Sequence, residues 1–335
     1  MTHFTRHLGA LAAGVALSAV AAGSVLADPA VIYDLGGKFD KSFNEASFTG
    51  AERWKAATGG NFVDLELQTD AQREQALRRF ASQGNNPVVM ASFSWPPALS
   101  AVAPEFPDTN FVVLDAVVDA PNVQSVLFAE HEGSFLVGAL AALKSETGAV
   151  GFVGGMDVPL IHKFYCGYAQ GAKAVNPDIK LFEAYTGTTP AAWNDPVAAG
   201  ELAKAQVDQG ADVVFAAAGG SGLGVLQAMK DAGKYSIGVD SNQNYLQPGS
   251  VLTSMLKRVD NVVENALTEA ADDATFKPGL SVANLATGGV DYALDEHNAS
   301  LITDDMKAKV DDLKAKIIAG EIAVHDYTTD STCPL

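Results

Sequence analysis

Three aspartates each follow a short apolar run that is typical of a β-strand. They are Asp34 after residues 30–33, Asp115 after residues 110–114 and Asp240 after residues 236–239. A carboxylate at the end of a strand can accept two hydrogen bonds, for instance from vicinal hydroxyl groups or from ring N–H groups. One such aspartate is usually a cap or an ordinary loop acid, but three at equivalent strand ends favour a ligand site.

The residues after the first of these aspartates read as a glycine turn and then the start of a helix. The order is Gly36-Gly37, then Ser42-Phe43-Asn44-Glu45, and then an amphipathic segment at 46–57. Ser42 and Glu45 have the spacing of a capping box, which predicts Ser42 as the N-cap of a helix over 43–57. Phe43 and Asn44 are then expected in the first helical turn, beside free backbone N–H groups. An aromatic face, a carboxamide and free donors at the end of a strand suit a small ligand.

Aromatic residues stand in or next to several of the expected loops, at Phe43, Phe93, Trp95 and Trp193. Trp193 leads into a predicted helix at 195–209, much as Phe43 leads into its own. Two aromatics from opposing parts of a cleft could sandwich a flat heterocycle by offset stacking and apolar burial. The alternative is ordinary packing, which is the commoner fate of a single aromatic, and we favour it for Phe93 and Trp95.

A glycine-rich loop and a lysine complete the set of candidate residues. The loop, 216–224, reads Ala-Ala-Ala-Gly-Gly-Ser-Gly-Leu-Gly and joins a predicted strand to a predicted helix. It lacks the G-x-G-x-x-G order of a dinucleotide loop, but glycine lets the backbone N–H of Gly220 approach a ligand closely. Lys257 follows another predicted strand and could donate to a ligand hydroxyl, or it could be a solvated surface lysine.

Strand-like runs and helical patterns alternate along most of the chain, which predicts an α/β fold with parallel sheets and helices on both faces. Strands are expected at 30–33, 62–65, 87–91, 110–114, 149–153, 180–184, 212–216, 236–239 and 250–255, and helices at 43–57, 70–83, 96–103, 131–146, 159–175, 195–209, 221–232 and 259–272. Residues 283–294 have strand character, and 304–319 read as a lysine-rich helix.

This alternation is long enough for two Rossmann-like lobes joined by a hinge, with ligand groups at the strand ends that face a cleft. The break is expected near Ala129 and Glu130. We assign residues 28–129 plus about 257–290 to an N-terminal lobe and residues 130–256 plus about 291–335 to a C-terminal lobe.

Residues 1–27 read as a secretory signal peptide. Arg6 precedes an apolar, alanine- and glycine-rich run from 8 to 26, and Val25-Leu26-Ala27 fits a small-x-small cleavage site. An uncleaved membrane anchor is the less favoured alternative, because the run ends in that site. We therefore expect cleavage after Ala27 and a mature protein outside the cytoplasm.

Charge and cysteine content narrow the classes of partner and cofactor. The formal net charge of −18 argues against nucleic acid and against anionic membrane surfaces, which both reward positive charge. Cys166 and Cys333 could form a disulfide in an oxidising compartment or remain free thiols, and the sequence leaves both open. The spacing of histidines, cysteines and acids predicts neither a metal site nor a cofactor.

The sequence lacks the common catalytic motifs, including G-x-S-x-G, the P-loop and H-E-x-x-H. A secreted, two-lobed α/β protein with a cleft and no evident catalytic set is typical of a binding protein, so we expect no enzyme activity.

Six sequence blocks run in order through most of the chain after residue 27. They are Asp34-x-Gly-Gly-x-x-Asp-Lys-Ser-Phe-Asn44 with Gly50, Phe106-Pro-x-x-x-Phe-x-x-x-Asp115, Glu132-Gly-Ser-Phe-Leu-x-Gly138, Gly148-x-Val-Gly-Phe-Val-Gly-Gly-Met-Asp-Val-Pro159, Phe164-x-x-Gly-Tyr-x-x-Gly-Ala-Lys-x-Val-Asn-Pro177 and Gly238-Val-Asp-Ser-Asn-Gln243. Together they resemble the basic membrane protein family of substrate-binding proteins for ABC transporters, in the type I periplasmic-binding fold.

This resemblance implies a purine nucleoside as the ligand and an ABC permease as the partner. It places the base between two rings, with Asn44 and Asp115 at its polar edge. It places the ribose hydroxyls with Asp240, Lys257 and the Gly220 backbone, with Asp34 nearby. The implied stacking residues are Phe43 and Trp193.

Two features depart from the family pattern. A glycine-rich turn is replaced here by Ala91-Ser-Phe-Ser-Trp95, and the lipid-anchoring cysteine is absent. The second departure fits a protein that diffuses freely in a Gram-negative periplasm, and we expect a monomer there.

Three other functions remain open from the sequence. A free pentose or related polyol would also use stacking aromatics and paired acids. A secreted enzyme, such as a nucleoside hydrolase or an NAD-dependent oxidoreductase, would need a metal cluster or a true dinucleotide loop. A sensor that presents the closed lobes to a receptor would share every feature of a transport protein.

Overall fold

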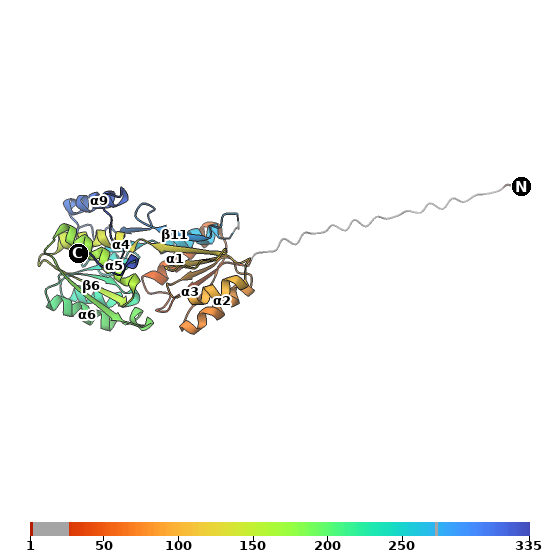
Figure 1. Ribbon diagram of the computed structural model, residues 1–335, viewed down its shortest axis with the longest axis horizontal. Helices are drawn as coiled ribbons and strands as arrows, with labels where there is room; N and C mark the ends of the chain where they lie inside the picture. The colour runs from red at the N-terminus through yellow and green to blue at the C-terminus, as the bar shows by residue number, and fades with distance from the viewer. Residues whose placement is uncertain (3–26, 272–273) are drawn as a thin grey trace.

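The structure is a computed structural model that describes residues 1–2, 27–271 and 274–335. The predicted signal peptide therefore lies, apart from its ends, outside the described residues. The described chain forms two lobes side by side, each built on a mostly parallel sheet (Figure 1). This arrangement confirms the predicted α/β class with two lobes.

The first lobe is a parallel sheet in the order β11-β5-β4-β3-β1-β2. Its strands are β1 (Ala30–Tyr33), β2 (Val63–Glu66), β3 (Val88–Ala91), β4 (Phe111–Leu114), β5 (Val123–Phe128) and β11 (Gly279–Ala283), and its helices are α1 (Phe43–Thr58), α2 (Arg73–Ser82), α3 (Pro96–Val102) and α8 (Val259–Glu269). Successive residues of β1 point into different cores, Val31 into one and Ile32 into the other, and both are fully buried. Burial on both faces explains why the inner strands β1, β3 and β4 read as continuous apolar runs.

The second lobe repeats this plan in the order β12-β10-β9-β8-β6-β7. Its strands are β6 (Ala149–Met156), β7 (Lys180–Gly187), β8 (Val213–Ala217), β9 (Tyr235–Asp240), β10 (Val251–Lys257) and β12 (Val290–Tyr292), and its helices are α4 (Glu130–Lys144), α5 (Pro159–Val175), α6 (Pro196–Asp208), α7 (Gly222–Asp231) and α9 (Asp304–Ile318). Only β12 among these strands runs antiparallel to its neighbour, β10. The predicted helix at 304–319 is confirmed as α9.

Within its described part, the chain passes between the two sheets three times, from β5 to α4, from β10 to α8 and from β11 to β12. The third passage corrects the expectation of one strand-like segment at 283–294. β11 ends at Ala283 in the first sheet, and β12 begins at Val290 in the second. A turn separates them, in which Gly288 has a positive φ of 70° that favours glycine.

Helices α4 and α5 pack closely because each presents glycine to the other. A Cβ added at Gly138 would overlap the backbone carbonyl of Tyr168, and one added at Gly171 would overlap that of Phe135. Both positions belong to the sequence blocks described above. These glycines therefore serve helix packing rather than the cleft.

A disulfide attaches the end of the chain to α5. Cys166, in the middle of α5, pairs with Cys333, and their Cα atoms are 5.5 Å apart. The same segment is fixed by Gln170, which exchanges two hydrogen bonds with the backbone of His325 at 3.1 and 2.8 Å. The disulfide that the sequence left open is thus present, and it closes a loop of 167 residues in sequence separation.

We predict that Gly171→Ala lowers the free energy of unfolding by about 1–3 kcal/mol, because the new methyl group forces α4 and α5 apart. The higher helix propensity of alanine offsets only part of this loss. Urea unfolding followed by circular dichroism measures the change. Gly187→Ala is the matched control, since its Cβ would meet Ala192 at an ordinary 3.5 Å. Equal midpoints for the two variants would contradict the packing argument.

Candidate functional site

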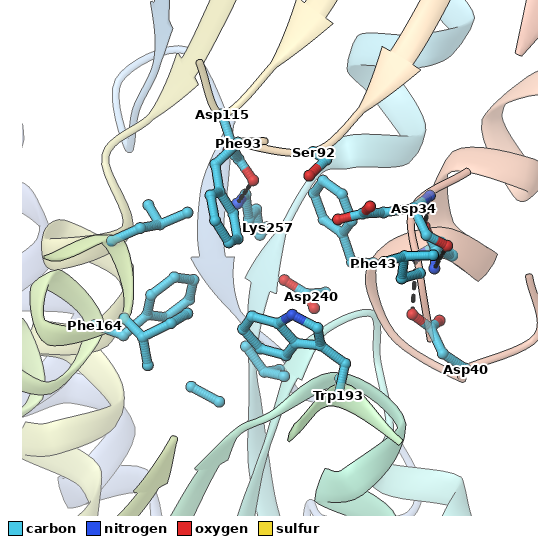
Figure 2. A pocket seen from close by; sticks show the side chains of 17 residues that line it. Asp34, Asp40, Phe43, Ser92, Phe93, Asp115, Phe164, Trp193, Asp240 and Lys257 are labelled. Carbon is cyan, nitrogen blue, oxygen red and sulfur yellow. Dashed lines mark hydrogen bonds and ion pairs between the residues drawn. The ribbon is translucent and has the colours of Figure 1, made fainter. Parts of the chain in front are cut away.

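A cavity lies between the lobes, where the carboxyl ends of the strands from both sheets meet (Figure 2). Of the eight residues that the sequence suggests for ligand binding, the structure brings seven together in its lining. They are Asp34, Phe43, Asn44, Asp115, Trp193, Asp240 and Lys257. Gly220 is not among the lining residues of the described chain, although its neighbour Gly219 is.

Asp115 and Asp240 occupy equivalent places in the two lobes. Asp115 directly follows β4, and Asp240 is the last residue of β9. Both have a φ of 63°, in the left-handed region that residues other than glycine seldom adopt. Such strained conformations concentrate at functional sites. The strain here turns both carboxylates toward the shared cavity.

Lys257 ends β10 and is almost completely buried, so the reading of it as a surface lysine is wrong. Its Nζ lies 2.6 Å from Asp115 Oδ2 and 3.0 Å from Glu130 Oε1. It also lies 5.0 Å from the ring centroid of Phe43 and 5.6 Å from that of Phe164. The ammonium group is thus held by two carboxylates and faced by aromatic rings, which attract cations.

The burial of these charges shifts their pKa values. Burial raises the pKa of Asp115 to about 6, although Lys257 opposes the shift. Burial also raises the pKa of Asp240, again against Lys257. Burial disfavours the charge on Lys257 itself, but Asp115, Glu130 and Asp240 outweigh it and raise the lysine pKa. For Glu130, burial is outweighed by Lys257 and Lys163, so its pKa falls. At neutral pH the lysine is charged and Asp115 is ionised beside it.

One oxygen of Asp115 is available to a ligand. Oδ2 accepts a hydrogen bond from Lys257, whereas Oδ1 is buried and has no hydrogen-bond partner among the described residues. A buried carboxylate oxygen without a partner costs free energy, and a hydroxyl or N–H donor would remove that cost.

The ion pairs continue away from the cavity through two residues that the sequence analysis missed, Glu130 and Lys163. Glu130 lies 3.0 Å from the Nζ of Lys163, which also donates to the Phe128 carbonyl at 2.8 Å and lies 3.2 Å from Asp326. Glu130 could have been noticed, because it stands at the break expected between the lobes. Lys163 lies within the predicted helix at 159–175 and carries no comparable signal.

The start of α1 is capped differently from the prediction. The carboxylate of Asp40 accepts hydrogen bonds from the backbone N–H groups of Ser42 at 2.8 Å, Asn44 at 3.0 Å and Glu45 at 3.1 Å. Ser42 makes no side-chain cap and instead donates its hydroxyl to Asp240 in the other lobe. Ser42 is the N-cap residue, as predicted, but the predicted capping box is absent. The expectation of free N–H donors beside Asn44 is also wrong, because Asp40 accepts from three N–H groups at this helix start.

Asp40 itself lines the cavity but is engaged with the backbone. Burial raises its pKa to about 7, while the N–H groups of Asn44, Glu45 and Ser42 favour the ionised form. Its carboxylate is thus a structural cap, in agreement with its place in the predicted turn.

The carboxamide of Asn44 is also occupied by the loop. Its Oδ1 accepts from the Asp34 N–H at 3.0 Å, and its Nδ2 donates to the carbonyls of Asp34 and Gly37 at 3.2 and 3.1 Å. Asn44 therefore shapes the loop that carries Asp34, and little of its hydrogen-bonding capacity remains for a ligand.

Trp193 reaches into the cavity from the second lobe, across from Phe43 in the first (Figure 2). It ends a short helical turn, Pro190–Trp193, that follows β7. A Cβ at Gly155 would overlap its indole ring, so the ring fits only because that residue has no side chain. Ser221 fixes the turn, accepting from the Asp195 N–H at 2.6 Å and donating to the Ala192 carbonyl at 2.7 Å.

Several apolar lining residues were not proposed as ligand contacts from the sequence. Phe93 packs edge-on to Trp193 at a centroid distance of 6.5 Å, and Leu160, Ile161 and Phe164 come from the first turns of α5. Trp95, in contrast, is fully buried in the first lobe, as the packing interpretation predicted.

Hydrogen bonds join the two lobes beside the cavity. Besides the bond from Ser42 to Asp240, the Ser241 hydroxyl donates to the Ser42 carbonyl at 3.2 Å. The Gln243 carboxamide donates to the Lys41 carbonyl at 2.9 Å. These contacts join the loop before α1 to the loop after β9. Among the described residues, no group of three or more histidines, cysteines and acids is placed to bind a metal.

Comparison with known proteins gives the family. Residues 28–328 match the model of the Bmp family, described as "ABC transporter substrate-binding protein PnrA-like". The chain belongs to this family. The match spans both lobes and every residue of the cavity lining, so the cavity described here is that of a Bmp-family protein.

Similar proteins cover nearly the whole of this Bmp-family chain. It is 34% identical over 313 residues to "ABC transporter nucleoside-binding protein BmpA" of Lactococcus lactis, covering 86% of this chain and 87% of that protein. It is 30% identical to "Basic membrane protein A" of Borreliella afzelii, covering 88% and 91%. A solved ABC transporter solute-binding protein from Aeropyrum pernix superposes with a TM-score of 0.81 at 29% identity, covering 89% and 93%.

These matches confirm the resemblance noted in the sequence. As a member of this family, the protein is the substrate-binding component of an ABC transporter, with a small-molecule ligand and a permease partner. Within the described residues, no helix is long and apolar enough to cross a membrane.

We predict that Lys257→Met lowers the free energy of unfolding by about 3–5 kcal/mol, because it leaves buried carboxylates without their cation. The pKa of Asp115, already raised, should rise further. A carboxyl group whose folded pKa is raised stabilises the folded state at low pH and loses this effect as pH rises through that pKa. The loss should therefore be smaller at pH 5 than at pH 8.

Urea unfolding at the two pH values measures this difference. Lys204→Met is the control, since Lys204 pairs with Glu201 in solvent and its loss should leave the unfolding midpoint unchanged at either pH. An equally small change in the unfolding midpoint for both substitutions would show that the charge of Lys257 does not stabilise the fold.

Proposed function

We propose that this protein binds a nucleoside, with a purine as its base, in the cavity between the lobes and delivers it to the permease of an ABC importer. The observation that carries the proposal is that aromatic rings from both lobes line one cavity together with carboxylates. Among the described residues, one of these carboxylates, Asp115, keeps a buried oxygen that has no hydrogen-bond partner. The description of the Lactococcus lactis relative as nucleoside-binding supports the proposal.

The base would lie between Phe43 and Trp193. Stacking on two rings suits a flat heterocycle and contributes roughly 0.5–1.5 kcal/mol per aromatic pair beyond the burial of area. Asp34 lies beside Phe43, whereas Asp115 lies with Lys257 at another side of the cavity (Figure 2). We therefore assign Asp34, rather than Asn44 or Asp115, to the polar edge of the base.

The sugar would lie against the charged cluster. Asp115 Oδ1 has no hydrogen-bond partner within the described part of the chain, and Asp240 is buried nearby with Ser42 as its donor. Vicinal hydroxyl groups donate well to carboxylates, and Lys257 can donate to a hydroxyl oxygen in return. The backbone of the loop at Gly219 and Gly220 would close this side.

In this proposal the lobes separate to admit the ligand, which breaks the hydrogen bonds that join them beside the cavity. Opening about the chain passages would be a hinge motion, and closure on the ligand would create the form that the permease recognises. In this proposal the protein is a periplasmic monomer without catalytic activity, released after cleavage of residues 1–27. The lobes would comprise residues 28–129 plus about 257–290 and residues 130–256 plus about 291–335.

Two alternatives use the same cavity. A free pentose would use the acids and a stacking ring, but it would not need rings on both sides. A nucleoside-processing enzyme would need a group that activates water. Aromatic residues from both lobes favour a base over a free sugar, which makes the pentose the second candidate.

We predict that the protein, freed of carried-over ligand, binds inosine, adenosine or guanosine in isothermal titration calorimetry, and binds ribose far more weakly. The stacked base supplies most of the apolar burial, so its removal should cost at least 100-fold in affinity. Binding of ribose but of no nucleoside, uridine included, would favour the sugar alternative.

The same titration tests two site residues. Trp193→Ala and Asp240→Ala should each weaken nucleoside binding by about tenfold or more, which corresponds to roughly 1.4 kcal/mol. Tyr245→Ala is the control, because Tyr245 is an exposed aromatic outside the cavity lining. Unchanged affinity in either site variant would remove that residue from the proposed contacts.

Incubation with inosine separates binding from catalysis. We expect chromatography to recover intact inosine after prolonged incubation at neutral pH. Release of hypoxanthine by wild-type protein but not by the Asp115→Asn variant would support the enzyme alternative instead.

A further inference from the structure

Arg73, in the first turn of α2, is bonded to the back of the candidate site. Its Nη2 lies 2.6 Å from Asp34 Oδ1, and the two side chains are only 5% and 13% exposed. Arg73 itself is buried and lies behind Asp34 rather than free in the cavity. Neither the sequence analysis nor the family resemblance assigned it a role.

The arginine is fixed from two further directions. Asp70 Oδ1 accepts from its Nε at 3.0 Å and from its Nη2 at 2.8 Å. Its guanidinium carbon lies 4.8 Å from the ring centroid of Trp95, which is fully buried. A planar guanidinium stacked on an indole and bonded to two carboxylates has little freedom to move. Trp95 thus supports the site from below, although it does not line the cavity.

This arrangement determines what Asp34 can offer a ligand. Arginine remains protonated in proteins and donates to Oδ1, so the carboxylate is held as a hydrogen-bond acceptor. Asn44 fixes the Asp34 backbone, because its carboxamide accepts from the Asp34 N–H and donates to the Asp34 carbonyl. The second oxygen, Oδ2, receives no hydrogen bond from the described residues, and Asp34 lines the cavity. The site therefore presents one oriented acceptor beside Phe43.

We propose that Arg73 is a positioning residue that makes Asp34 an obligatory acceptor, so that the site requires an N–H donor on the edge of the ligand's base. This inference rests on the proposed binding of a nucleoside and adds a rule for which bases are accepted. Hypoxanthine and guanine carry a ring N–H, and adenine carries an amino group, at the edge that would face Asp34. Unsubstituted purine has neither.

The physical reason is the cost of leaving a carboxylate oxygen without a donor. When the lobes close, Asp34 loses water, and only the ligand can replace it. A site built to bond a polar group rejects an analogue that lacks the group much more strongly than a pocket rejects a missing methylene. Base shape and stacking are nearly the same for purine riboside and inosine, so the comparison isolates the donor.

Calorimetric titration of wild-type protein with inosine, adenosine and purine riboside tests the rule. We expect both inosine and adenosine to bind at least about tenfold more tightly than purine riboside, the range for a hydrogen bond to a charged group. Equal affinity for the three ligands would overturn the inference while leaving the proposed function intact. Binding of none of them by folded protein would overturn both.

Variants then separate the arginine from the general fold. Arg73→Met should reduce the ratio of inosine to purine riboside affinity by at least threefold, mainly through weaker inosine binding. Arg73→Lys should restore part of the ratio, because it keeps a cation beside Asp34. An unchanged ratio in Arg73→Met would contradict a positioning role.

A control and a second variant keep the test decisive. Arg78 lies on the same helix, pairs with Glu74 and Glu105, and does not line the cavity, so Arg78→Met should leave the ratio unchanged. If Arg73→Met does not fold, Asp34→Asn serves in its place. Its carboxamide can donate to a bare ring nitrogen, so the affinity for purine riboside relative to that for inosine should rise at least tenfold. A constant ratio of the two affinities would overturn the inference.

Discussion

A buried ammonium group, that of Lys257, is shared by carboxylates from separate parts of the chain. Asp115 comes from the end of a first-lobe strand, and Glu130 stands where the chain passes into the second lobe. Lys257 stands at the next such passage, between β10 and α8. Desolvation of these charges is expensive, and only their mutual attraction compensates for it. The geometry of the hinge and that of the ligand cavity therefore depend on the same group.

The remaining acids of the cavity follow the same principle, because each has its own donor. Arg73 supports Asp34, backbone N–H groups support Asp40, and Ser42 supports Asp240. Without these donors, the carboxylates of the cavity would repel one another or become protonated. Assigned donors let the site offer oriented acceptors while closed to water, which is what recognition of hydroxyl and N–H groups demands.

Much of this fold could be predicted from the sequence, since strands buried on both faces give unmistakable apolar runs and the helices between them are amphipathic. Residues at strand ends, such as Asp115 and Asp240, could be selected because parallel sheets bring those ends together. What could not be predicted were partnerships across long sequence separations. The capping box is one example: Ser42 stands at the N-cap, but Asp40 accepts from the backbone N–H groups there and the serine hydroxyl donates to Asp240 instead. Arg73 is another, because a helical arginine gives no local sign that it meets a carboxylate 39 positions earlier.

The passages of the chain between the lobes have a consequence for the order of folding. The first sheet lacks its edge strand β11 until residue 283 has been made, and the second lacks β12 until residue 292. The two sheets are therefore completed within nine residues of each other, late in synthesis, rather than one after the other. Contacts so distant in sequence slow folding, because the entropy of closing a long loop is lost before the stabilising contacts form. A nascent chain of this protein would remain without a finished sheet in either lobe until most of its length had emerged.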